Sequence, residues 1–352
     1  MKIFRCDHCG QLIFFENSFC TRCGRTLAFL PGRRRMAALE AAGDGRWRVA
    51  TRSGRGAVYR LCRNYHTENV CNWALPASDP HELCASCRLT RTLPDLSVAG
   101  HAQSWYRLEV AKRRLLYSLI ELRLPIKNRI EDPRRGLTFD FLADTPAPGG
   151  AVMTGHADGV ITINVAEADD PEREKRRVAM HEPYRTLLGH FRHEIGHYYW
   201  DRLIAGSPRL DAFRERFGDE RDDYAQALQR HYGRVDDGRW QIAYVSHYAS
   251  SHPWEDWAET WAHYLHITDT LQTAAACGLS LRDVPLPGAG ELPRRVRGSF
   301  DALFERWLPL TFALNNLNRG LGQPDAYPFV LSQAAIDKLR FVHDSIAWRE
   351  KT

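Results

Sequence analysis

Residues 193–197 read His-Glu-Ile-Gly-His, two imidazoles and one carboxylate at a spacing that can do metal chemistry. On a helix, side chains four residues apart project from the same face. His193 and His197 can therefore share one zinc ion at about 2.0–2.1 Å. Glu194, one residue further round, can accept a proton from a zinc-bound water as a general base. Because so short a motif also arises by chance, it needs a helix to carry it and a third ligand.

The chain around this motif has the periodicity of a helix. Pro183 suits a first turn and Gly206 suits a helix end. Apolar residues recur between them at helical spacing: Leu187, Leu188, Phe191, Ile195, Tyr198, Tyr199 and Leu203. The sequence therefore predicts a helix over 183–206 that presents both histidines on one side.

A catalytic zinc keeps three protein ligands and one open position, and an acidic pair further along the chain can supply the third ligand. Pro253 and Gly278 suit the two ends of a second predicted helix. One stripe of it comprises Trp254, Trp257, Trp261, Leu265 and Thr268. Glu255 and Glu259 lie on another face of this helix. The many tryptophans nearby indicate that this face is buried, and a buried carboxylate needs a partner such as zinc. Spacing alone allows either glutamate as the ligand, and His263 is a further alternative.

The two motifs together, His-Glu-x-x-His on one helix and Glu-Asp-Trp-Ala-Glu on the next, resemble the gluzincin metallopeptidases. The resemblance implies that Glu255 is the third zinc ligand and that Glu259 orients a histidine from outside the ligand set. The lethal-factor-like branch has a tyrosine seven residues before the ligand glutamate, which implies that Tyr248 donates to the oxyanion. Tyr244 is the alternative for that role.

The same resemblance implies a zincin-like architecture, in which a small mixed sheet packs on the helix that carries the histidines. Substrate would then lie along an edge strand of the sheet and add a strand to it. Residues 159–165 alternate in the manner of a strand and are the candidate for that edge.

Eight of the nine cysteines lie within the first 87 residues, in two groups of four. The first group is Cys6, Cys9, Cys20 and Cys23, two Cys-x2-Cys pairs. Each pair can direct two thiolates at one metal ion, and a glycine follows each pair where a positive φ is useful. Four thiolates make a closed structural zinc site, and this one resembles a rubredoxin-like zinc ribbon. We expect Phe14, Phe15 and Phe19 to pack over it.

The second group is Cys62, Cys71, Cys84 and Cys87, which we expect to hold a second structural zinc. The first two of these are irregularly spaced, so His66 or His81 could replace one sulfur. The other alternative is that Cys62 and Cys71 are buried small hydrophobic residues. Cys277 remains, and we expect it to be a buried thiol in a helix.

The rest of the chain predicts an α+β fold. The expected elements are a short strand near 56–61, a helix over 103–125, strands over 136–146 and 160–165, a partly helical charged link over 169–183, and helices over 299–320 and 332–348. Ser332 is the expected N-cap of the last helix. We divide the chain into a zinc ribbon (1–30), a second cysteine-rich zinc-binding module with its connector (31–95), and a mostly helical zincin-like domain with a small mixed sheet (96–352).

Composition narrows the class of protein. The 352 residues are 44% hydrophobic and 26% charged, as in soluble globular proteins. No apolar run reaches the roughly 18–20 residues that span a bilayer, and the N-terminal residues lack the apolar core of a signal peptide. We therefore expect a cytoplasmic protein with no membrane partner. The net charge of +5 does not by itself imply nucleic acid, but Arg46, Trp47, Arg48 and Arg60, near the cysteines, leave a nucleic-acid partner open.

Over nearly its full length the chain resembles a bacterial family of zinc-binding metallopeptidases that carry a zinc ribbon. The resemblance rests on the cysteine pairs, on FRHEIGHYYWDRLI (191–204) and on SSHPWEDWAETWAHYLHITDTL (250–271). It implies hydrolysis of a protein or peptide substrate with one catalytic zinc and one or two structural zincs. The alternative is an inactive scaffold that recruits a protein or a nucleic acid through its ribbons.

Overall fold

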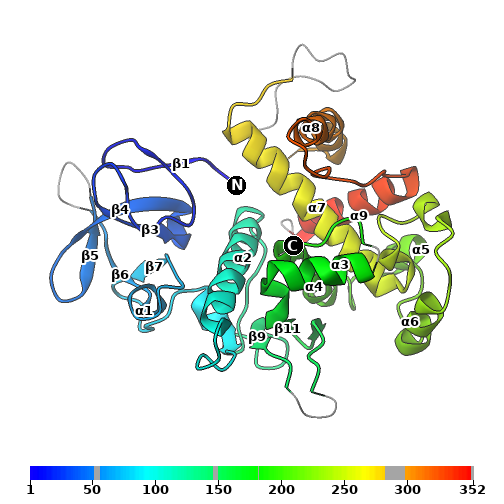
Figure 1. Ribbon diagram of the computed structural model, residues 1–352, viewed down its shortest axis with the longest axis horizontal. Coiled ribbons are helices and arrows are strands. Elements are labelled where there is room, and N and C mark those ends of the chain that lie inside the picture. Colours follow the sequence, from blue (N-terminus) through cyan, green and yellow to red (C-terminus); the bar gives the residue numbers. More distant parts are fainter. Residues whose placement is uncertain (51–55, 146–149, 181, 282–297, 350–352) are drawn as a thin grey trace. The chain divides into compact units, whose positions relative to one another are not determined.

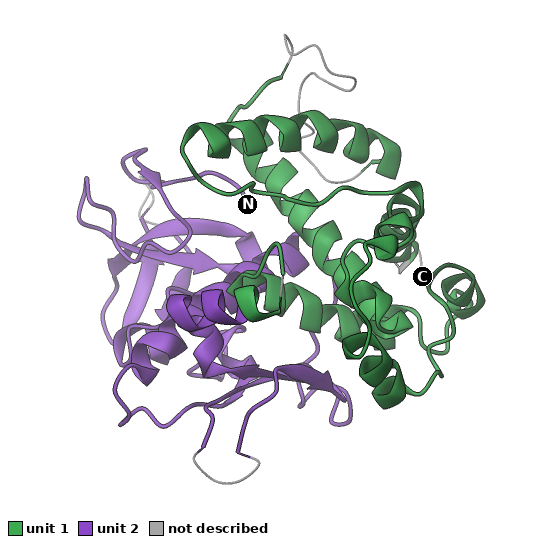
Figure 2. Cartoon of the chain, turned by 45° about the vertical axis from the view of Figure 1, so that its right-hand side comes forward, with its two compact units in different colours: residues 1, 177–352 green, residues 2–176 purple. Residues whose placement is uncertain are grey.

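The computed structural model describes residues 1–50, 56–145, 150–180, 182–281 and 298–349 (Figure 1). Two compact units are present, one of Lys2–Arg176 and one of Met1 with Arg177–Thr352 (Figure 2). The predicted α+β fold is confirmed, because the first unit holds the cysteine groups and the sheets while the second is helical. The units divide the chain at residue 176, and the boundaries drawn at residues 30 and 95 stay a prediction.

The front of the first unit is built from short antiparallel strands. A hairpin of β1 (Phe4–Arg5) and β2 (Leu12–Ile13) precedes a five-stranded sheet of order β3-β4-β5-β6-β7. Its strands are β3 (Thr26–Leu30), β4 (Arg35–Ala41), β5 (Arg46–Val49), β6 (Val58–Leu61) and β7 (Ala74–Pro76), with η1 (Pro31–Arg33), α1 (Arg63–His66) and η2 (Cys87–Leu89) between or after them. Alternate residues of these strands, among them Leu39, Val49 and Tyr59, form one small apolar core.

Aromatic side chains form a second cluster in this unit. Phe15 is buried against Phe29 and Tyr117, at ring-centroid distances of 5.0 and 5.4 Å. The prediction that Phe14 and Phe19 pack over the first cysteine group is wrong, because 79% and 60% of these side chains are exposed. Side chains alternate between the two sides of an extended chain, so the neighbour of buried Phe15 points to solvent.

The second sheet of this unit is small and mixed, as predicted. It has the order β10-β11-β9-β8, with β8 (Thr90–Thr92), β9 (Thr138–Leu142), β10 (Gly155–Ala157) and β11 (Val160–Asn164). β9 runs parallel to both of its neighbours, whereas β10 and β11 are antiparallel. Helix α2 (His101–Glu121) confirms the helix predicted over 103–125. Packing of this sheet on the helix that carries the histidines stays a prediction.

The prediction that residues 159–165 form an edge strand is wrong. β11 has β10 on one side and β9 on the other, so it lies inside the sheet. Ile161 and Ile163 are fully buried, as the alternation indicates. Alternating apolar residues identify a strand with a buried face but do not reveal how many neighbours it has. The edge strand on this side is β10.

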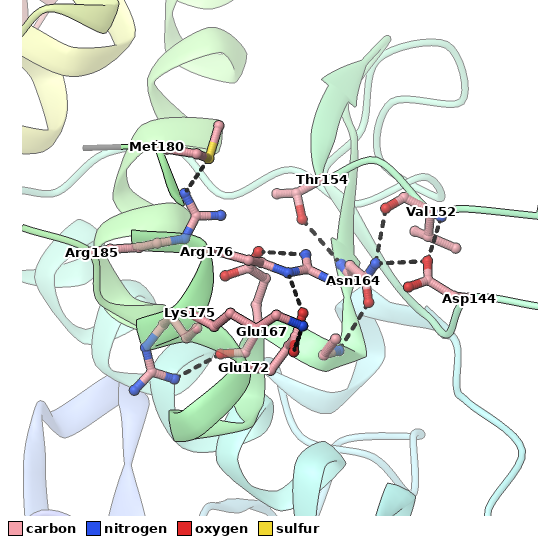
Figure 3. A network of polar contacts seen from close by, with 12 residues as sticks. Asp144, Val152, Thr154, Asn164, Glu167, Glu172, Lys175, Arg176, Met180 and Arg185 are labelled. Atoms are coloured by element: carbon pink, nitrogen blue, oxygen red, sulfur yellow. Dashed lines mark hydrogen bonds and ion pairs between the residues drawn. The ribbon is translucent and has the colours of Figure 1, made fainter. Parts of the chain in front are cut away.

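A polar network holds the end of β11 (Figure 3). Asn164 Nδ2 donates to Asp144 Oδ1 and to the Val152 carbonyl, both at 2.9 Å. In the next turns, η3 (Val165–Ala168) and α3 (Asp170–Ala179), Arg176 Nη1 donates to the buried Glu167 Oε1 at 3.0 Å. These bonds satisfy polar groups where the sheet ends, and α3 confirms the expectation of a partly helical link.

The second unit is a set of helices around one long central helix. Its elements are α4 (Leu187–Leu203), α5 (Leu210–Phe217), α6 (Tyr224–Tyr232), η4 (Arg239–Ile242), η5 (Tyr248–Ser250), α7 (Pro253–Ala276), α8 (Phe300–Gly320) and α9 (Gln333–Arg349). Helix α7 contacts α4, α8 and α9 (Figure 1). Among the helices that the structure describes, none combines the length and apolar character that a bilayer-spanning segment needs.

The observed ends of the helices can be compared with the helix starts and ends that the sequence predicted. Pro253 stands in the first turn of α7, and Ser332 Oγ accepts from Ala335 N at the start of α9, as predicted. Pro183 is not in the first turn of α4, because Thr186 Oγ1 caps the helix by accepting from Gly189 N at 3.0 Å. Cys277 is exposed rather than buried, since α7 ends one residue before it.

Gly196 allows α4 and α7 to approach closely. A Cβ atom at this position would lie 2.9 Å from the Ala258 Cα atom. Trp257 Nε1 donates to the Gly196 carbonyl at 2.8 Å, and the rings of Tyr199 and Trp261 stack at 4.9 Å. Backbone therefore packs directly on backbone where the two helices cross.

Substitution of Gly196 by Ala should destabilise this unit. The added methyl group has no room against the α7 backbone, and overpacking of this kind costs about 1–3 kcal/mol of the free energy of unfolding. Urea unfolding followed by circular dichroism measures the change. Gly320→Ala is the matched control, because a Cβ there meets no atom within 4 Å and alanine is the better helix former. Equal effects of the two substitutions would contradict the close approach.

Candidate metal centre

Helices α4 and α7 bring three metal-binding side chains together. His193, His197 and Glu255 offer one ligand atom each, all within 4.8 Å of one another. Glu255 Oε2 lies 2.9 Å from His193 Nε2 and 3.6 Å from His197 Nε2. Ligands bound tetrahedrally at about 2.0–2.1 Å are separated by roughly 3.3 Å, so the observed distances bracket those of a zinc site.

One carboxylate oxygen of Glu255 shows whether this donor set suits a metal ion. Glu255 is buried, and its Oε2 atom has no hydrogen-bond partner among the described residues although His193 Nε2 is 2.9 Å away. The two atoms are at ion-pair distance but lack the geometry of a good hydrogen bond. Two nitrogens and one carboxylate oxygen that face a common point are the donor set of a catalytic zinc, and they fit it.

Glu259 lies outside this group and contacts His193 from the other side. Its Oε1 atom is 2.7 Å from His193 Nδ1, and its Oε2 atom accepts from Ser246 Oγ at 2.6 Å. A carboxylate can only accept, so His193 donates from Nδ1, which leaves Nε2, on the side of Glu255, as the nitrogen that can bind a metal ion. Carboxylates that orient ligand histidines in this way are usual around zinc.

The donor set holds buried charge that needs compensation. Burial opposes ionisation of Glu255, but His197 and His193 lower the pKa of its carboxyl well below the ordinary value. Burial also opposes a charged His193, while Glu255 and Glu259 raise the pKa of its imidazole well above the ordinary value. The carboxylates therefore require a cation between them, which is either a proton or a metal ion.

Glu194 lies on α4 between the two histidines in sequence and is also buried. Its Oε2 atom has no hydrogen-bond partner in the part of the chain that the structure describes. Burial raises the pKa of its carboxyl above the usual range, although His193 and His197 act in the opposite direction. A carboxylate with a raised pKa and an unpartnered oxygen is suited to accepting a proton.

Two tyrosines border the donor set. The Tyr248 ring, in η5, lies 5.9 Å from the His193 ring. Burial and the nearby Glu255 raise the pKa of its phenol, so the hydroxyl stays protonated. Tyr224 was not predicted, yet its hydroxyl donates to Glu255 Oε1 at 2.8 Å. No local signal in α6 marks it, because this contact exists only in the folded chain.

Tyr244 and His263, the two alternatives from the sequence, and the neighbouring His252 have partners of their own. The Lys338 ammonium nitrogen lies 4.2 Å from the centre of the Tyr244 ring. Tyr244 also packs against a small apolar cluster of Val245, Ala249 and Ala335. His263 Nδ1 is 2.6 Å from the Tyr327 hydroxyl. His252 is the N-cap of α7, where its Nδ1 atom accepts from Trp254 N. Neither histidine belongs to the metal-binding groups found among the described residues, and the oxyanion role of Tyr244 stays a prediction.

The first cysteine group has the geometry of a tetrahedral sulfur site. The Sγ atoms of Cys6 and Cys23 are 3.7 Å apart, and those of Cys9 and Cys20 are 3.6 Å apart. Four sulfurs at about 2.3 Å from zinc would be separated by roughly 3.8 Å, whereas a disulfide bond is about 2.05 Å long. Gly10, at a φ of 77°, allows the tight turn that follows the first pair.

The second group consists of four buried cysteines: Cys62, Cys71, Cys84 and Cys87. His66 and His81 are not part of it. The Sγ atoms of Cys71 and Cys84 are 3.7 Å apart, and the Cys62 sulfur accepts from Cys84 N at 3.3 Å. Arg113 is buried nearby, and these thiols with Glu109 raise the pKa of its guanidinium against the effect of burial. Its charge offsets that of the thiolates.

Comparison with known proteins agrees with this geometry. A family model described as "Putative zinc-binding metallo-peptidase" matches residues 101–345, and a zinc-ribbon domain model matches residues 3–98. The chain belongs to this metallopeptidase family. Among its relatives are uncharacterized proteins of Mycobacterium tuberculosis and Mycobacterium bovis, each 48% identical over 345 residues, which is 97% of this chain and 94% of the relative. No solved structure matches.

Substitution of Glu259 by Gln should weaken zinc binding at the His193 group. Glutamine keeps the volume but removes the charge that supports the His193 proton, and such changes typically cost about 10–100-fold in metal affinity. Competition with a chromophoric chelator measures the affinity. Glu215→Gln is the control, because Glu215 is exposed on α5. An unchanged affinity in the Glu259 variant would contradict an orienting role.

Proposed function

We propose that the protein is a zinc-dependent peptidase that hydrolyses peptide bonds in a protein or peptide substrate. One observation carries the proposal: two imidazole nitrogens and a buried carboxylate oxygen, for which no described residue provides a hydrogen bond, face one another, with Glu194 beside them. Three donors leave one position of a tetrahedral zinc open, which distinguishes catalytic sites from closed structural sites. Membership of the metallopeptidase family supports the same reaction class.

In this proposal His193, His197 and Glu255 hold the zinc ion, and Glu259 orients His193. Zinc, when bound there, supplies a Lewis acid that polarises the scissile carbonyl and acidifies water. Glu194 moves the proton: its carboxylate takes it from the attacking water and passes it to the leaving amine nitrogen as the carbon–nitrogen bond breaks. The raised pKa of Glu194 makes it a stronger base than an exposed glutamate.

The two tyrosines have different roles in the proposed site. Tyr248 donates a hydrogen bond from its phenolic hydroxyl to the oxygen that becomes negative when water attacks the carbonyl carbon. Its hydroxyl is suited to this role because burial keeps it protonated. Tyr224 is a positioning residue, since its bond to Glu255 Oε1 leaves Oε2 facing the histidines.

The two cysteine groups are proposed to hold one structural zinc ion each. Their sulfur separations match the edges of a zinc–sulfur tetrahedron, and each group supplies four sulfurs. All nine cysteines are free thiols. Free thiols persist in reducing compartments, which supports the proposal that the protein acts in the cytoplasm.

Zinc stoichiometry should separate the three sites. Elemental analysis of the wild type should find three zinc ions per chain. A His193→Ala/His197→Ala variant should retain two, because the cysteine groups share no ligand with the histidine site. Two zinc ions in both proteins would contradict a zinc site at His193 and would favour a scaffold that binds partners through its ribbons.

Peptide cleavage should depend on Glu194. Screening of a peptide library by mass spectrometry should find substrates that the wild type cleaves. Glu194→Gln should lower kcat by about 10²–10⁴-fold, as expected for loss of a general base, while the zinc content stays at three. Glu215→Gln serves as the control for an exposed charge. Full activity in the Glu194 variant would refute the mechanism.

A further inference from the structure

A cavity of about 880 Å³ lies in the helical unit. Its volume is within the range of ligand pockets, about 300–1,000 Å³. The last turn of α6, the segment around η4, and residues flanking η5 form its walls. The side chains that matter here are Arg230, His231, Arg234, Trp240 and His247.

The cavity adjoins the candidate metal centre through Tyr248. The Tyr248 ring is 5.9 Å from the His193 ring and 6.1 Å from the His231 ring. Helix α6 connects the two places as well, because Tyr224 bonds to Glu255 and His231 lines the cavity. Residues seven apart share one face of a helix and are about 10 Å apart along its axis. An extended peptide covers that distance in about three residues.

The cavity is lined by three arginines, Arg230, Arg234 and Arg239, and by two aspartates, Asp236 and Asp237, so positive charge is in excess by one. Asp237 accepts from Arg239 Nε at 2.6 Å, and Asp236 accepts from Trp240 Nε1 at 3.1 Å. The guanidinium groups of Arg230 and Arg234 have no ion pair or hydrogen bond within the described residues. Arg230, in the last turn of α6, also suits the helix dipole.

We propose that this cavity binds an acidic side chain of the peptide substrate, about three residues from the scissile bond, through Arg230 and Arg234. The proposal rests on the proposed function for its substrate class. Guanidinium groups match carboxylates in shape and charge. Trp240 supplies an apolar wall for the methylene groups of a glutamate, and the imidazoles of His231 and His247, at 4.3 Å, close another side.

The test measures binding without turnover. Isothermal titration calorimetry on zinc-loaded Glu194→Gln protein compares an acetylated octapeptide that contains four glutamates with its glutamine counterpart. The glutamate peptide should bind about tenfold more tightly, and an Arg230→Gln/Arg234→Gln change should remove that difference. The control is Arg221→Gln/Arg319→Gln, which removes the same charge from residues that pair with Asp219 and Asp325 outside the cavity.

The outcomes separate this proposal from the proposed function. If the Glu194→Gln protein binds the glutamate and glutamine peptides with equal affinity, the cavity proposal is overturned. It is also overturned if the Arg221→Gln/Arg319→Gln control loses as much affinity for the glutamate peptide as the Arg230→Gln/Arg234→Gln variant. Cleavage of neutral and acidic library peptides at equal kcat/KM overturns it while the peptidase activity stands. Arginine-dependent binding of the glutamate peptide, with no cleavage of any peptide by the wild type, supports the cavity and overturns the peptidase.

Discussion

The backbone contact between α4 and α7 at Gly196 determines the geometry of the candidate centre. Gly196 directly precedes His197, and Ala258, which it meets, directly precedes Glu259. Donors on two helices can converge only if the helix axes are close enough for short side chains to meet. A side chain at the crossing would separate the helices and move the histidine nitrogens away from the Glu255 carboxylate. Gly196, which has no side chain, thus sets the distances among the candidate metal-binding residues.

The charges around this crossing are costly for the fold. Glu194, Glu255 and Glu259 are all buried or nearly so, and isolated buried carboxylates are strongly unfavourable. Asp256, between them, is offset by Lys338 at 2.6 Å. Glu255 and Glu259 have the imidazoles of α4, Ser246 and Tyr224 as polar partners, and no residue that the structure describes forms a hydrogen bond with Glu194 Oε2. Apolar side chains of similar volume would often give a more stable fold, so this arrangement fits a site for a cation better than a contribution to stability.

Local sequence signals predicted much of the fold and part of the site. Pro253 and Ser332 start helices as expected, since capping depends on a few adjacent residues. Pro183 misled because Thr186 offers a stronger cap three residues later. The inner position of β11 and the bond from Tyr224 to Glu255 could not be read from the chain, because both depend on segments that meet only after folding. Periodicity reports burial but not the identity of a neighbour.

The three metal-binding groups differ in what surrounds them, and that difference bears on their roles. The cysteine groups lie in turns and loops beside short strands with a small apolar core, where a bound metal ion would contribute to folding itself. Each already supplies four sulfurs, so no position remains for a substrate. The histidine group lies on helices that have their own core, with Trp257, Trp261 and Trp307 almost fully buried. This group supplies three donors rather than four, so a zinc ion held there would keep one coordination position open.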